Sequence, residues 1–596
     1  MKPRYLVLVA KTKPIPIDWV QFAAEIGLRV VVDAFPTMVC VNSAARTYAV
    51  GKGVIVGSLF PRHGPPRELC SLAAGNTEQI LKTSGGELLR SFWGSYLSII
   101  PSGPSVTRVL RDPSGTLNCY YIDGSAFTIF ASDVDLLFDT GLVSSSVDWS
   151  AVGRHHLDGG LPSSLTCLTD VQELLPGCSL DVPGDHQQVP RWSPWNFVNA
   201  SPDPHGDPVH ERLRRVIDNC CQALASRHDQ LLLSVSGGLD SSILASCLAR
   251  GGHEVRCLTM YTDDRAGDER MYARALCRHL GLPLVECRYQ LEDVDIDRAV
   301  SAHLPRPIGR TLNQAFERRH LEVARNGGID AFVSGNGGDN VFGYSQSAAA
   351  IADRWLSEGM TVGVWRTLWS ICQQTGCGPT AAIRGAIRSR FRRTYRWRWQ
   401  PAFLSQEVAA MGEGGPKHAW LEAPAATLPA KAAHVAALLR VQPLLDPGRT
   451  ALAPVIYPLV SQPVIEACLA ISSWEWRTRG RDRAVARDAF SSDLPDLISR
   501  RRIKVGPDGF SGTILNSHRE AIRSRLLDGN LARQNLVDRL ALETALRGEQ
   551  PIQAADQTRI LDLLDTEAWG EHWQARLAKV SFRPAFGEFL SAPPSV

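Results

Sequence analysis

Short apolar runs separated by glycine and proline dominate about the first 200 residues of the chain. Four of these runs, residues 28–32, 38–41, 54–56 and 96–100, are rich in Val, Ile and Leu. Apolar runs of this length between turn residues are typical of β-strands. We therefore predict a β-rich N-terminal domain over residues 1–200.

The pattern changes after the segment 199–208, NASPDPHGDP, whose Pro, Gly, Asp and Ser content marks a domain boundary. An apolar run, 231–235, is followed by a glycine turn and a helical pattern over 240–250. Strand and helix patterns then alternate through 255–264, a helix ended by Gly281, a helix over 315–326 and a strand at 331–333. This alternation predicts a doubly wound α/β domain over residues 208–596.

The first glycine turn, SGGLDSS at 236–242, has the chemistry of a phosphate-binding loop. Its two glycines permit close approach of the backbone, and its serine hydroxyls and the free N–H groups of the helix start supply donors. The turn is not a Walker A loop, because it contains no lysine. Asp240 would repel a bare phosphate, so we predict that it holds a divalent cation against the phosphates.

A second glycine turn, SGNGGD at 334–339, follows the strand at 331–333 and carries Asp339. Parallel strands of one sheet place their carboxyl ends on one rim, which is where ligands bind in open α/β sheets. We therefore expect Asp240 and Asp339 to lie on the same rim.

The two turns resemble known signatures. SGGLDSS is similar to the pyrophosphate loop of the ATP-pyrophosphatase enzymes (adenine nucleotide α-hydrolase-like fold), and the stretch 335–344, GNGGDNVFGY, resembles the GEGxDExFxGY signature of asparagine synthetases. The resemblance implies ATP and Mg²⁺ as cofactors, with Asp240 and Asp339 as catalytic metal ligands. It implies ATP and pyrophosphate contacts from Ser234, Ser236, Gly237, Gly238, Asp240, Ser241, Ser242, Leu258, Met260, Ser334, Gly335 and Gly337.

Two departures accompany this resemblance. Asn336 and Asn340 stand where the asparagine synthetase signature has glutamates. An amide cannot transfer the protons that a carboxylate transfers, so the ammonia-handling chemistry of asparagine synthetases is in doubt here.

The C-terminal block 456–472 and the later stretch RRRIKVG resemble the end of asparagine synthetase-like domains. By resemblance to β-lactam synthetases, Lys504 would reach the active site and neutralise charge as the acyl-adenylate is attacked. The alternative is that Lys504 is one more cation in a basic turn. We expect Arg481, Arg483 and Arg500–Arg502 to be surface or structural residues.

Segments 86–100, 109–121 and 171–180 resemble, in that order, the glutaminase (Ntn-type) domain of class II amidotransferases. Those glutaminases use an N-terminal cysteine as nucleophile. Here position 2 is Lys2 and the first cysteine is Cys40. We therefore expect a vestigial domain that does not hydrolyse glutamine and packs on the synthetase half; the alternative is a recruited role in gripping a partner or substrate.

Charge and composition narrow the classes of protein to which the chain could belong. The chain has a formal charge of +3 over 596 residues, which does not suggest nucleic-acid binding over the whole surface. Its N-terminal apolar run is too short for a signal peptide or a membrane span. The 14 cysteines show no CxxC zinc spacing, so we read them as small buried hydrophobes and expect a cytoplasmic protein.

Arginine and aromatic side chains alternate in the segment 383–399. Arg384, Arg388, Arg392 and Arg396 recur every four residues beside Ile383, Ile387, Phe391, Tyr395 and Trp399. On one helix these would form adjacent basic and apolar stripes. Three interpretations stay open: a packed helix with a solvated arginine face, a docking surface for an acidic peptide or partner protein, and an RNA contact.

Three stretches, WGSY at 93–96, GDERMYAR at 267–274 and GNGGDN at 335–340, resemble the lasso peptide macrolactam synthetases more closely than the β-lactam synthetases. That resemblance implies an ATP-dependent carbon–nitrogen ligase that adenylates an Asp or Glu side chain of a precursor peptide for attack by its N-terminal amine. It also implies two partners, a leader peptidase and a leader-binding protein. The alternatives are a β-lactam synthetase-like or asparagine synthetase-like ligase acting on a small molecule, and a non-catalytic scaffold.

Overall fold

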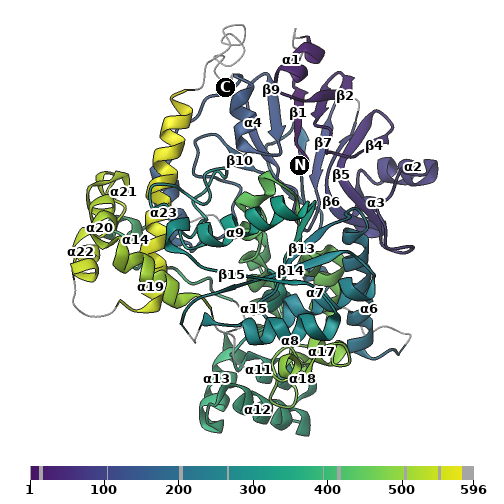
Figure 1. The fold of residues 1–596 in the computed structure, drawn as a ribbon. Helices are drawn as coiled ribbons and strands as arrows, with labels where there is room; N and C mark the ends of the chain where they lie inside the picture. The colour runs from purple at the N-terminus through teal and green to yellow at the C-terminus, as the bar shows by residue number, and fades with distance from the viewer. Residues whose placement is uncertain are drawn as a thin grey trace.

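The computed structural model describes residues 2–12, 18–103, 105–199, 206–264, 267–392, 395–412, 418–501, 506–547 and 552–579. Two antiparallel sheets form the N-terminal half and one parallel sheet lies at the centre of the C-terminal half (Figure 1). The mixed α/β architecture predicted from the sequence is confirmed.

The antiparallel sheets contain six strands each, in the orders β10-β8-β9-β1-β3-β2 and β12-β11-β7-β6-β5-β4. Their bounds are β1 (Tyr5–Ala10), β2 (Arg29–Ala34), β3 (Thr37–Val41), β4 (Thr47–Val50), β5 (Gly53–Pro61), β6 (Phe92–Pro101), β7 (Thr107–Arg111), β8 (Tyr120–Asp123), β9 (Phe127–Ala131), β10 (Gln172–Glu173), β11 (Cys178–Val182) and β12 (Val189–Pro190). Three of the four predicted apolar runs lie within strands β3, β5 and β6. The fourth, 28–32, starts one residue before β2.

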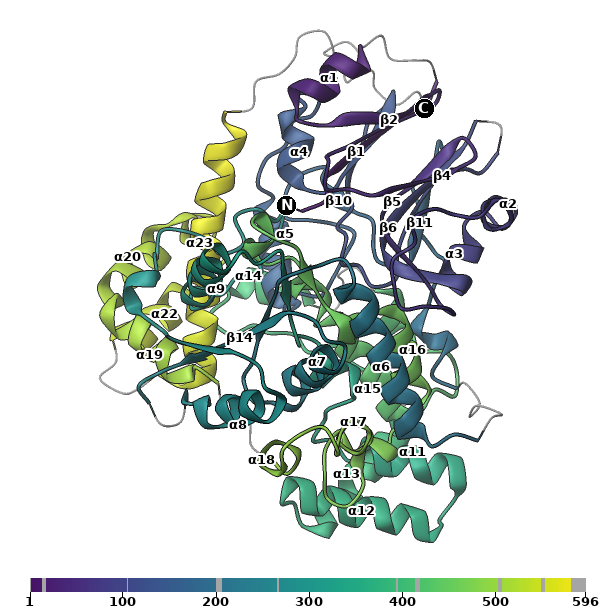
Figure 2. The ribbon, with the colours of Figure 1, turned by 45° about the vertical axis from the view of Figure 1, so that its right-hand side comes forward.

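Alternation along β1 shows how the two sheets pack as a sandwich (Figure 2). Tyr5, Val7 and Val9 belong to the core between the sheets, whereas Leu6 and Leu8 belong to a second core on the outer face. A strand points successive side chains to opposite faces, so every residue of β1 is buried because both faces of its sheet are covered.

Helices cover the outer faces of the sandwich. In the N-terminal half these are α1 (Trp19–Glu25), α2 (Ala74–Lys82), α3 (Gly86–Ser91), α4 (Val134–Asp139) and α5 (Trp149–Leu157). The long helix α23 (Ala554–Leu577) also packs there, with Trp573 against Phe138 and Arg576 paired with Asp135 (Figure 1). The last described helix of the chain thus closes over the first sheet.

The parallel sheet has the order β15-β14-β13-β16-β17. Its strands are β13 (Leu231–Ser234), β14 (Val255–Tyr261), β15 (Leu284–Arg288), β16 (Ala331–Val333) and β17 (Val455–Ile456). Helix α6 (Val209–Ala225) precedes β13, and α7 (Leu239–Arg250), α8 (Arg270–Leu280) and α9 (Asn313–Gly327) follow β13, β14 and β15 in turn. Leu231 and Leu233 pack in the core that holds α6 and α7, whereas Leu232 packs in the core that holds Ala324 of α9. Helices therefore cover both faces of the sheet, as a doubly wound domain requires.

The other helices also belong to the C-terminal half. They are α10 (Gly338–Val341), α11 (Ala349–Glu358), α12 (Val362–Thr375), α13 (Pro379–Phe391), α14 (Gln406–Ala410), α15 (Pro429–Leu439), α16 (Gln462–Ala470), α17 (Ala484–Ala489), α18 (Asp496–Ser499), α19 (Asp508–Ser517), α20 (Arg519–Asp528), α21 (Asn530–Arg533) and α22 (Arg539–Arg547). Helices α11, α12 and α13 form a lobe at the foot of the molecule with a small core of its own (Figure 1).

The N-terminal and C-terminal halves share buried contacts. Leu59 and Trp93 of the second sheet lie in one hydrophobic core with Ile217 of α6. Glu466 of α16 accepts a hydrogen bond from Trp192 Nε1 at 2.8 Å. The predicted boundary at 199–208 stays a prediction, and residues 200–205 lie outside the described ranges.

The prediction that residues 383–399 form one helix with arginine and apolar stripes is wrong. Helix α13 ends at Phe391, so Arg396 and Trp399 do not continue the stripes of Arg384 and Arg388. Tertiary contact overrides the repeat, because Trp397 is buried and its Nε1 donates to the Asp158 carbonyl at 2.6 Å. Among the described residues, no helix combines the length and the apolar character needed to cross a membrane.

Candidate functional site

The first glycine turn connects β13 to α7 and is shaped by one obligatory glycine. Gly237 has φ +63°, and a Cβ at this position would lie 2.2 Å from Tyr272 Cβ. Any other residue would both strain the backbone and collide with α8. Gly238 is the N-cap of α7, so the free N–H groups of that helix begin at the turn.

The serine hydroxyls of this turn differ in their surroundings. Ser242 is fully buried and donates to the Gly238 carbonyl at 2.7 Å, so its hydroxyl stabilises the first turn of α7. Ser236 accepts from the Gly238 N–H at 3.3 Å. Ser234, at the end of β13, bonds to His320 Nε2 at 2.6 Å. Burial lowers the pKa of His320 to about 3, so this imidazole is neutral.

A cavity of about 560 Å³ lies over this rim of the parallel sheet. Its volume falls in the usual range for a small-ligand site. The residues predicted for ATP that line it are Ser234, Ser236, Gly238, Asp240, Ser241, Leu258, Met260, Ser334 and Gly335. The structure does not place Gly237, Ser242 or Gly337 in its lining: Gly237 faces Tyr272, Ser242 is turned into α7, and Gly337 packs against Val460.

The second glycine turn follows β16 and contacts the first turn directly. A Cβ on Gly338 would lie 2.4 Å from Asp240 Cγ, and a Cβ on Gly335 would lie 3.1 Å from Ser241 N. These glycines let the two turns approach closely, as the position of their strands on one rim predicts. Asp240 and Asp339 are consequently brought together.

Arg483 bridges the two predicted metal ligands. Its Nη1 lies 3.1 Å from Asp240 Oδ1 and also donates to Asp339 Oδ1. Although burial disfavours a charged guanidinium, Asp240, Asp339 and Asp482 raise the pKa of Arg483 above its ordinary value. We expected Arg483 to be a surface or structural residue, but the structure places it, 8% exposed, at the centre of the site.

The geometry at Arg483 tests whether a cation fits here. Two carboxylate oxygens converge on one positively charged nitrogen, so they can share one cationic partner. Among the described residues, no group of three or more His, Cys, Asp and Glu side chains could hold a metal ion. Two carboxylates suit Mg²⁺ that takes its other ligands from phosphate and water, rather than a metal held by protein alone.

The asparagines of the second turn have separate surroundings. Asn340 Nδ2 donates to the Ala437 carbonyl of α15 at 2.8 Å, a bond that a carboxylate could not make. Asn336 lines the cavity. The amide at position 340 therefore serves the packing of the turn against α15.

The basic stretch near residue 500 is only partly described. Lys504, predicted to be catalytic, lies outside the described residues. Arg501 approaches the first turn from behind: it donates to the Ser236 carbonyl at 3.2 Å, pairs with Glu269 and lies 3.9 Å from the Tyr272 ring. Arg501 therefore supports the loop structurally, as expected.

The N-terminal half reaches the wall of the same cavity. Asp446, a lining residue, accepts from Lys2 Nζ at 2.5 Å and from Asn118 Nδ2 at 2.7 Å. Burial alone would raise the pKa of Asp446, but Lys2 and His303 hold it below its ordinary value. Cys40 is fully buried, and desolvation raises the pKa of its thiol to about 12.

Comparisons with known proteins agree with this site. The asparagine synthase family model matches residues 212–571, which contain both glycine turns and Arg483. The tRNA-specific 2-thiouridylase MnmA of Chloroflexus aurantiacus is 31% identical over 123 residues, 18% of this chain and 34% of its own. The Microcin J25-processing protein McjC of Escherichia coli is 24% identical over 148 residues, 24% of this chain and 28% of its own.

The chain thus spans about a third of the length of these curated relatives. A solved structure described as the allosteric regulatory enzyme of purine biosynthesis is 12% identical, with a TM-score of 0.20 and coverage of 48% of this chain and 80% of its own. The family match covers more than half of the chain and includes the two turns that meet at Asp240 and Asp339. The chain belongs to the asparagine synthase family of ATP-dependent amide ligases.

Proposed function

We propose that this protein closes a macrolactam ring in a peptide, as in lasso peptide biosynthesis. The observation that carries the proposal is the convergence of Asp240 and Asp339 on one cationic centre beside the cavity of the first glycine turn. The similarity to the Microcin J25-processing protein supports a peptide as the substrate. The proposed setting is the cytoplasm.

The reaction would proceed in two displacements. An oxygen of an Asp or Glu side chain of the peptide attacks the α-phosphorus of ATP, so that an acyl-adenylate forms and pyrophosphate leaves. The peptide's N-terminal amine then attacks the acyl carbon, forms the amide, loses a proton and releases AMP. Activation is needed because a carboxylate is a poor acyl donor, and holding both groups together supplies further acceleration.

The residues of the site have separate tasks in this proposal. The Ser236–Ser242 loop and the start of α7 would hold the departing pyrophosphate. Bound Mg²⁺, held by Asp240 and Asp339, would neutralise phosphate charge. Arg483 would supply positive charge to the same place, and Lys504 would neutralise the developing charge during attack on the acyl-adenylate.

An amine within the substrate fits better than ammonia from glutamine. The amide of Asn340 is bound to a backbone carbonyl, so it has no proton-transfer role for ammonia. Residues 1–200 contain an exposed cysteine, Cys70, and four buried ones, Cys40, Cys119, Cys167 and Cys178, and desolvation raises the pKa of each buried thiol to about 12. Such thiols would not supply a thiolate at neutral pH.

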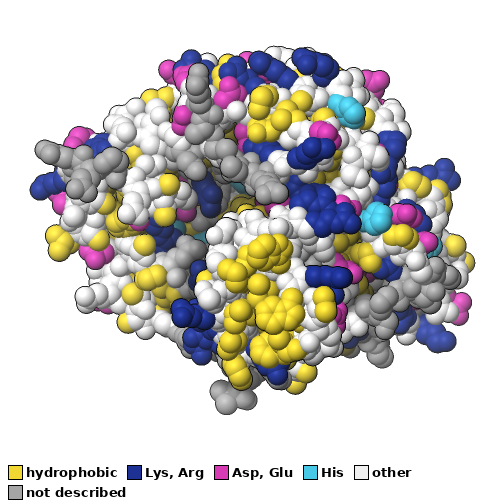
Figure 3. Space-filling view, turned by 90° about the horizontal axis from the view of Figure 1, so that it is seen from below, with side chains coloured by type: hydrophobic (Ala, Val, Ile, Leu, Met, Phe, Trp, Pro, Cys, Tyr) yellow, Lys and Arg dark blue, Asp and Glu magenta, His cyan; other side chains and the backbone are white. Residues whose placement is uncertain are grey.

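Partner proteins that prepare and deliver the peptide would dock on the lobe of α11–α13. Figure 3 shows apolar side chains gathered on this face beside basic ones. The exposed apolar residues are Met360, Val362, Trp365, Trp369, Ile383, Ile387 and Phe391. Arg366 and Arg384 are exposed on the same helices. We therefore propose as partner a leader-binding protein or leader peptidase whose contact surface is apolar at its centre and carries acidic side chains around it.

The test is AMP and pyrophosphate formation with candidate peptides. We expect both products only with a peptide that has a free N-terminus and an acidic residue in the ring-closing position, together with loss of one water mass. An N-acetylated version of the same peptide is the matched control and should give no ring.

Robust turnover of free aspartate with ammonia, or of a small molecule alone, would replace this proposal by an asparagine synthetase-like or β-lactam synthetase-like ligase. Tight partner binding without nucleotide turnover on any peptide would make the protein a scaffold.

A further inference from the structure

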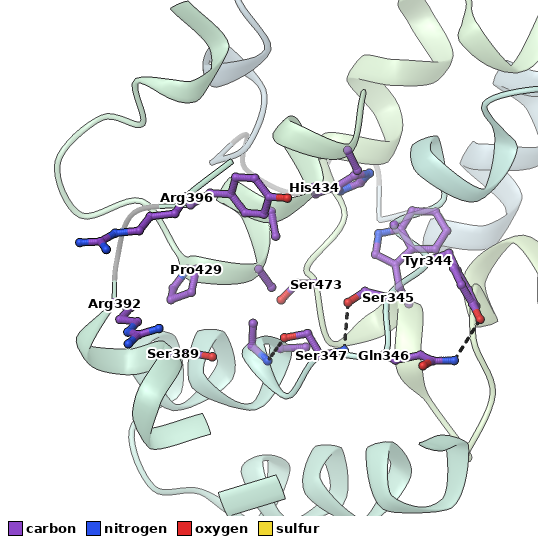
Figure 4. A pocket seen from close by; sticks show the side chains of 18 of the residues that line it. Tyr344, Ser345, Gln346, Ser347, Ser389, Arg392, Arg396, Pro429, His434 and Ser473 are labelled. Atoms are coloured by element: carbon purple, nitrogen blue, oxygen red, sulfur yellow. Dashed lines mark hydrogen bonds between the residues drawn. The ribbon is translucent and has the colours of Figure 1, made fainter. Parts of the chain in front are cut away.

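A cavity of about 1,170 Å³, larger than the one over the glycine turns, lies between the lobe and α15. Its walls come from the end of α13, the start of α15 and the segment 343–350 that follows the second glycine turn. Figure 4 shows Tyr344, Ser345 and Ser347 on one side of this space and Arg392 and Arg396 on the opposite side. We call it the arginine cavity.

The charges of the arginine cavity are all of one sign. Among the described residues, its lining contains no aspartate, glutamate or lysine, but it contains Arg388, Arg392, Arg396, Arg398, Arg440 and Arg477. Within the described part of the chain, none of the six forms a salt bridge, whereas arginines elsewhere routinely do, as Arg319 does with Asp293. Like charges gathered without counter-charge repel one another and favour an anionic ligand.

Two buried donors in the wall add a specific signal. Trp476 is 1% exposed and its Nε1–H has no hydrogen-bond partner among the described residues; the same is true of Nε of Arg477, which is 5% exposed. A buried donor without a partner is costly, and such groups are rare in folded proteins. Both residues line the arginine cavity, so its wall contains hydrogen-bond donors that the described protein groups leave unused.

The arginine cavity adjoins the nucleotide site. Tyr344 lines the cavity, and its backbone N–H donates to the Asp339 carbonyl at 2.8 Å. The Arg483 guanidinium, which holds Asp240 and Asp339, lies 5.4 Å from the Tyr344 ring. A chain bound in the cavity could therefore extend past Tyr344 toward the adenylation site.

We infer that the arginine cavity binds an acidic segment of the peptide substrate, through carboxylates other than the one that is activated. This inference rests on the proposed function for the identity of the peptide, but the cavity itself is independent of it. The neutral part of the lining combines small apolar side chains such as Ala433 and Pro429 with hydroxyl groups such as that of Ser347. Neutral apolar and hydroxyl groups between cationic ones suit a peptide with spaced carboxylates.

The test measures binding without ATP. A short fluorescein-labelled peptide with several glutamates is titrated against the full-length protein by anisotropy, beside the same peptide with glutamine at those positions. We expect tighter binding of the glutamate peptide and a loss of affinity for it of more than about tenfold in R392E/R396E, about 1.4 kcal/mol. Both arginines are exposed, so this variant should fold.

The matched control is R29E/R67E, which makes the same change in net charge at two exposed arginines of the N-terminal half. Equal effects of the two double variants, or equal binding of the two peptides, would overturn the inference. So would an RNA oligonucleotide that binds this cavity while the glutamate peptide does not.

The inference and the proposed function fail separately. If a peptide yields AMP but its affinity is unchanged in R392E/R396E, the cavity inference is wrong and the ligase proposal stands. If the glutamate peptide binds and R392E/R396E weakens it, but no peptide yields AMP, the cavity inference stands and the ring-closing proposal falls.

Discussion

Replacing Arg483 by methionine should make the stability of the protein depend on Mg²⁺. In the structure the guanidinium, 8% exposed, neutralises Asp240 and Asp339, whose side chains are 11% and 33% exposed. Arg483→Met keeps a long side chain but removes the guanidinium from between two facing carboxylates. Mg²⁺ should then bind between the two carboxylates and restore the stability that the substitution removes.

The size of the stability loss in Arg483→Met follows from how deeply the ion pairs of Arg483 are buried. Breaking a buried ion pair by removing one partner costs roughly 3–5 kcal/mol. Because a third of the Asp339 side chain meets solvent, we expect the lower end, about 3 kcal/mol. In a chain of this length that corresponds to a fall of a few degrees in the apparent melting temperature. Saturating Mg²⁺ at about 100 times its Kd would return about 2.7 kcal/mol.

The assay is thermal unfolding of the wild type and Arg483→Met across a Mg²⁺ series without nucleotide. Arg487→Met is the matched control, because Arg487 is as deeply buried and pairs with Asp482 but not with Asp240 or Asp339. We expect Mg²⁺ to rescue only the Arg483 variant. Equal Mg²⁺ stabilisation of all three proteins, or an undiminished melting temperature in Arg483→Met, would refute the shared cation site.

Three further outcomes are expected. Gly237→Ala should weaken ATP binding and lower stability, because the added Cβ would lie 2.2 Å from a side-chain carbon of α8; this is measured by nucleotide titration and thermal unfolding. Asn340→Asp should lower stability by about 1–3 kcal/mol, measured by urea unfolding, because its bond to the Ala437 carbonyl is lost. Stability should fall as pH drops below 6.5 toward 3, because buried His320, with its pKa lowered to about 3, stays neutral while the unfolded chain takes up a proton. Each pH unit in that window lowers the free energy of unfolding by about 1.4 kcal/mol per such histidine. His320→Gln should therefore reduce the slope of stability against pH by the contribution of one histidine.

Each of these outcomes has a control. Gly252 also has a positive φ, +70°, but nothing lies within 4 Å of a Cβ added there. Gly252→Ala should therefore lower stability without changing the affinity for ATP. If Gly252→Ala matches Gly237→Ala in nucleotide affinity, the close-approach argument is incorrect. Asn336→Asp, on the cavity wall, should spare stability; a loss equal to that of Asn340→Asp would contradict the packing role. An unchanged pH slope in His320→Gln would contradict the titration argument.

The local pattern of the sequence predicted the fold well. Apolar runs between turn residues identified strands such as β16, whose bounds agree with the prediction, and the two glycine turns placed Asp240 and Asp339 on one rim. These features depend on neighbouring residues, so periodicity and turn chemistry are enough to find them.

The features that were missed depend on contacts between distant segments. Arg483 reaches Asp240 across 243 positions, and nothing around it in the sequence distinguishes it from the other arginines. The fourfold arginine repeat suggested one long helix, yet the burial of Trp397 against Asp158 diverts the chain after Phe391. The resemblance to β-lactam synthetases indicated Lys504 as the active-site cation, whereas Arg483, the arginine at the centre of the site, was expected to be a surface or structural residue.

The carboxylate of Asp446 connects the N-terminal half to the cavity over the glycine turns. Lys2 and Asn118 of that half donate hydrogen bonds to it, as Thr450 of the C-terminal half does, and Asp446 lines the cavity. Removing the half would take the Lys2 ammonium away from this carboxylate and change the charge of the cavity wall. A chain without the N-terminal half would therefore need a compensating change at Asp446, so the half bears on this cavity whatever its own role.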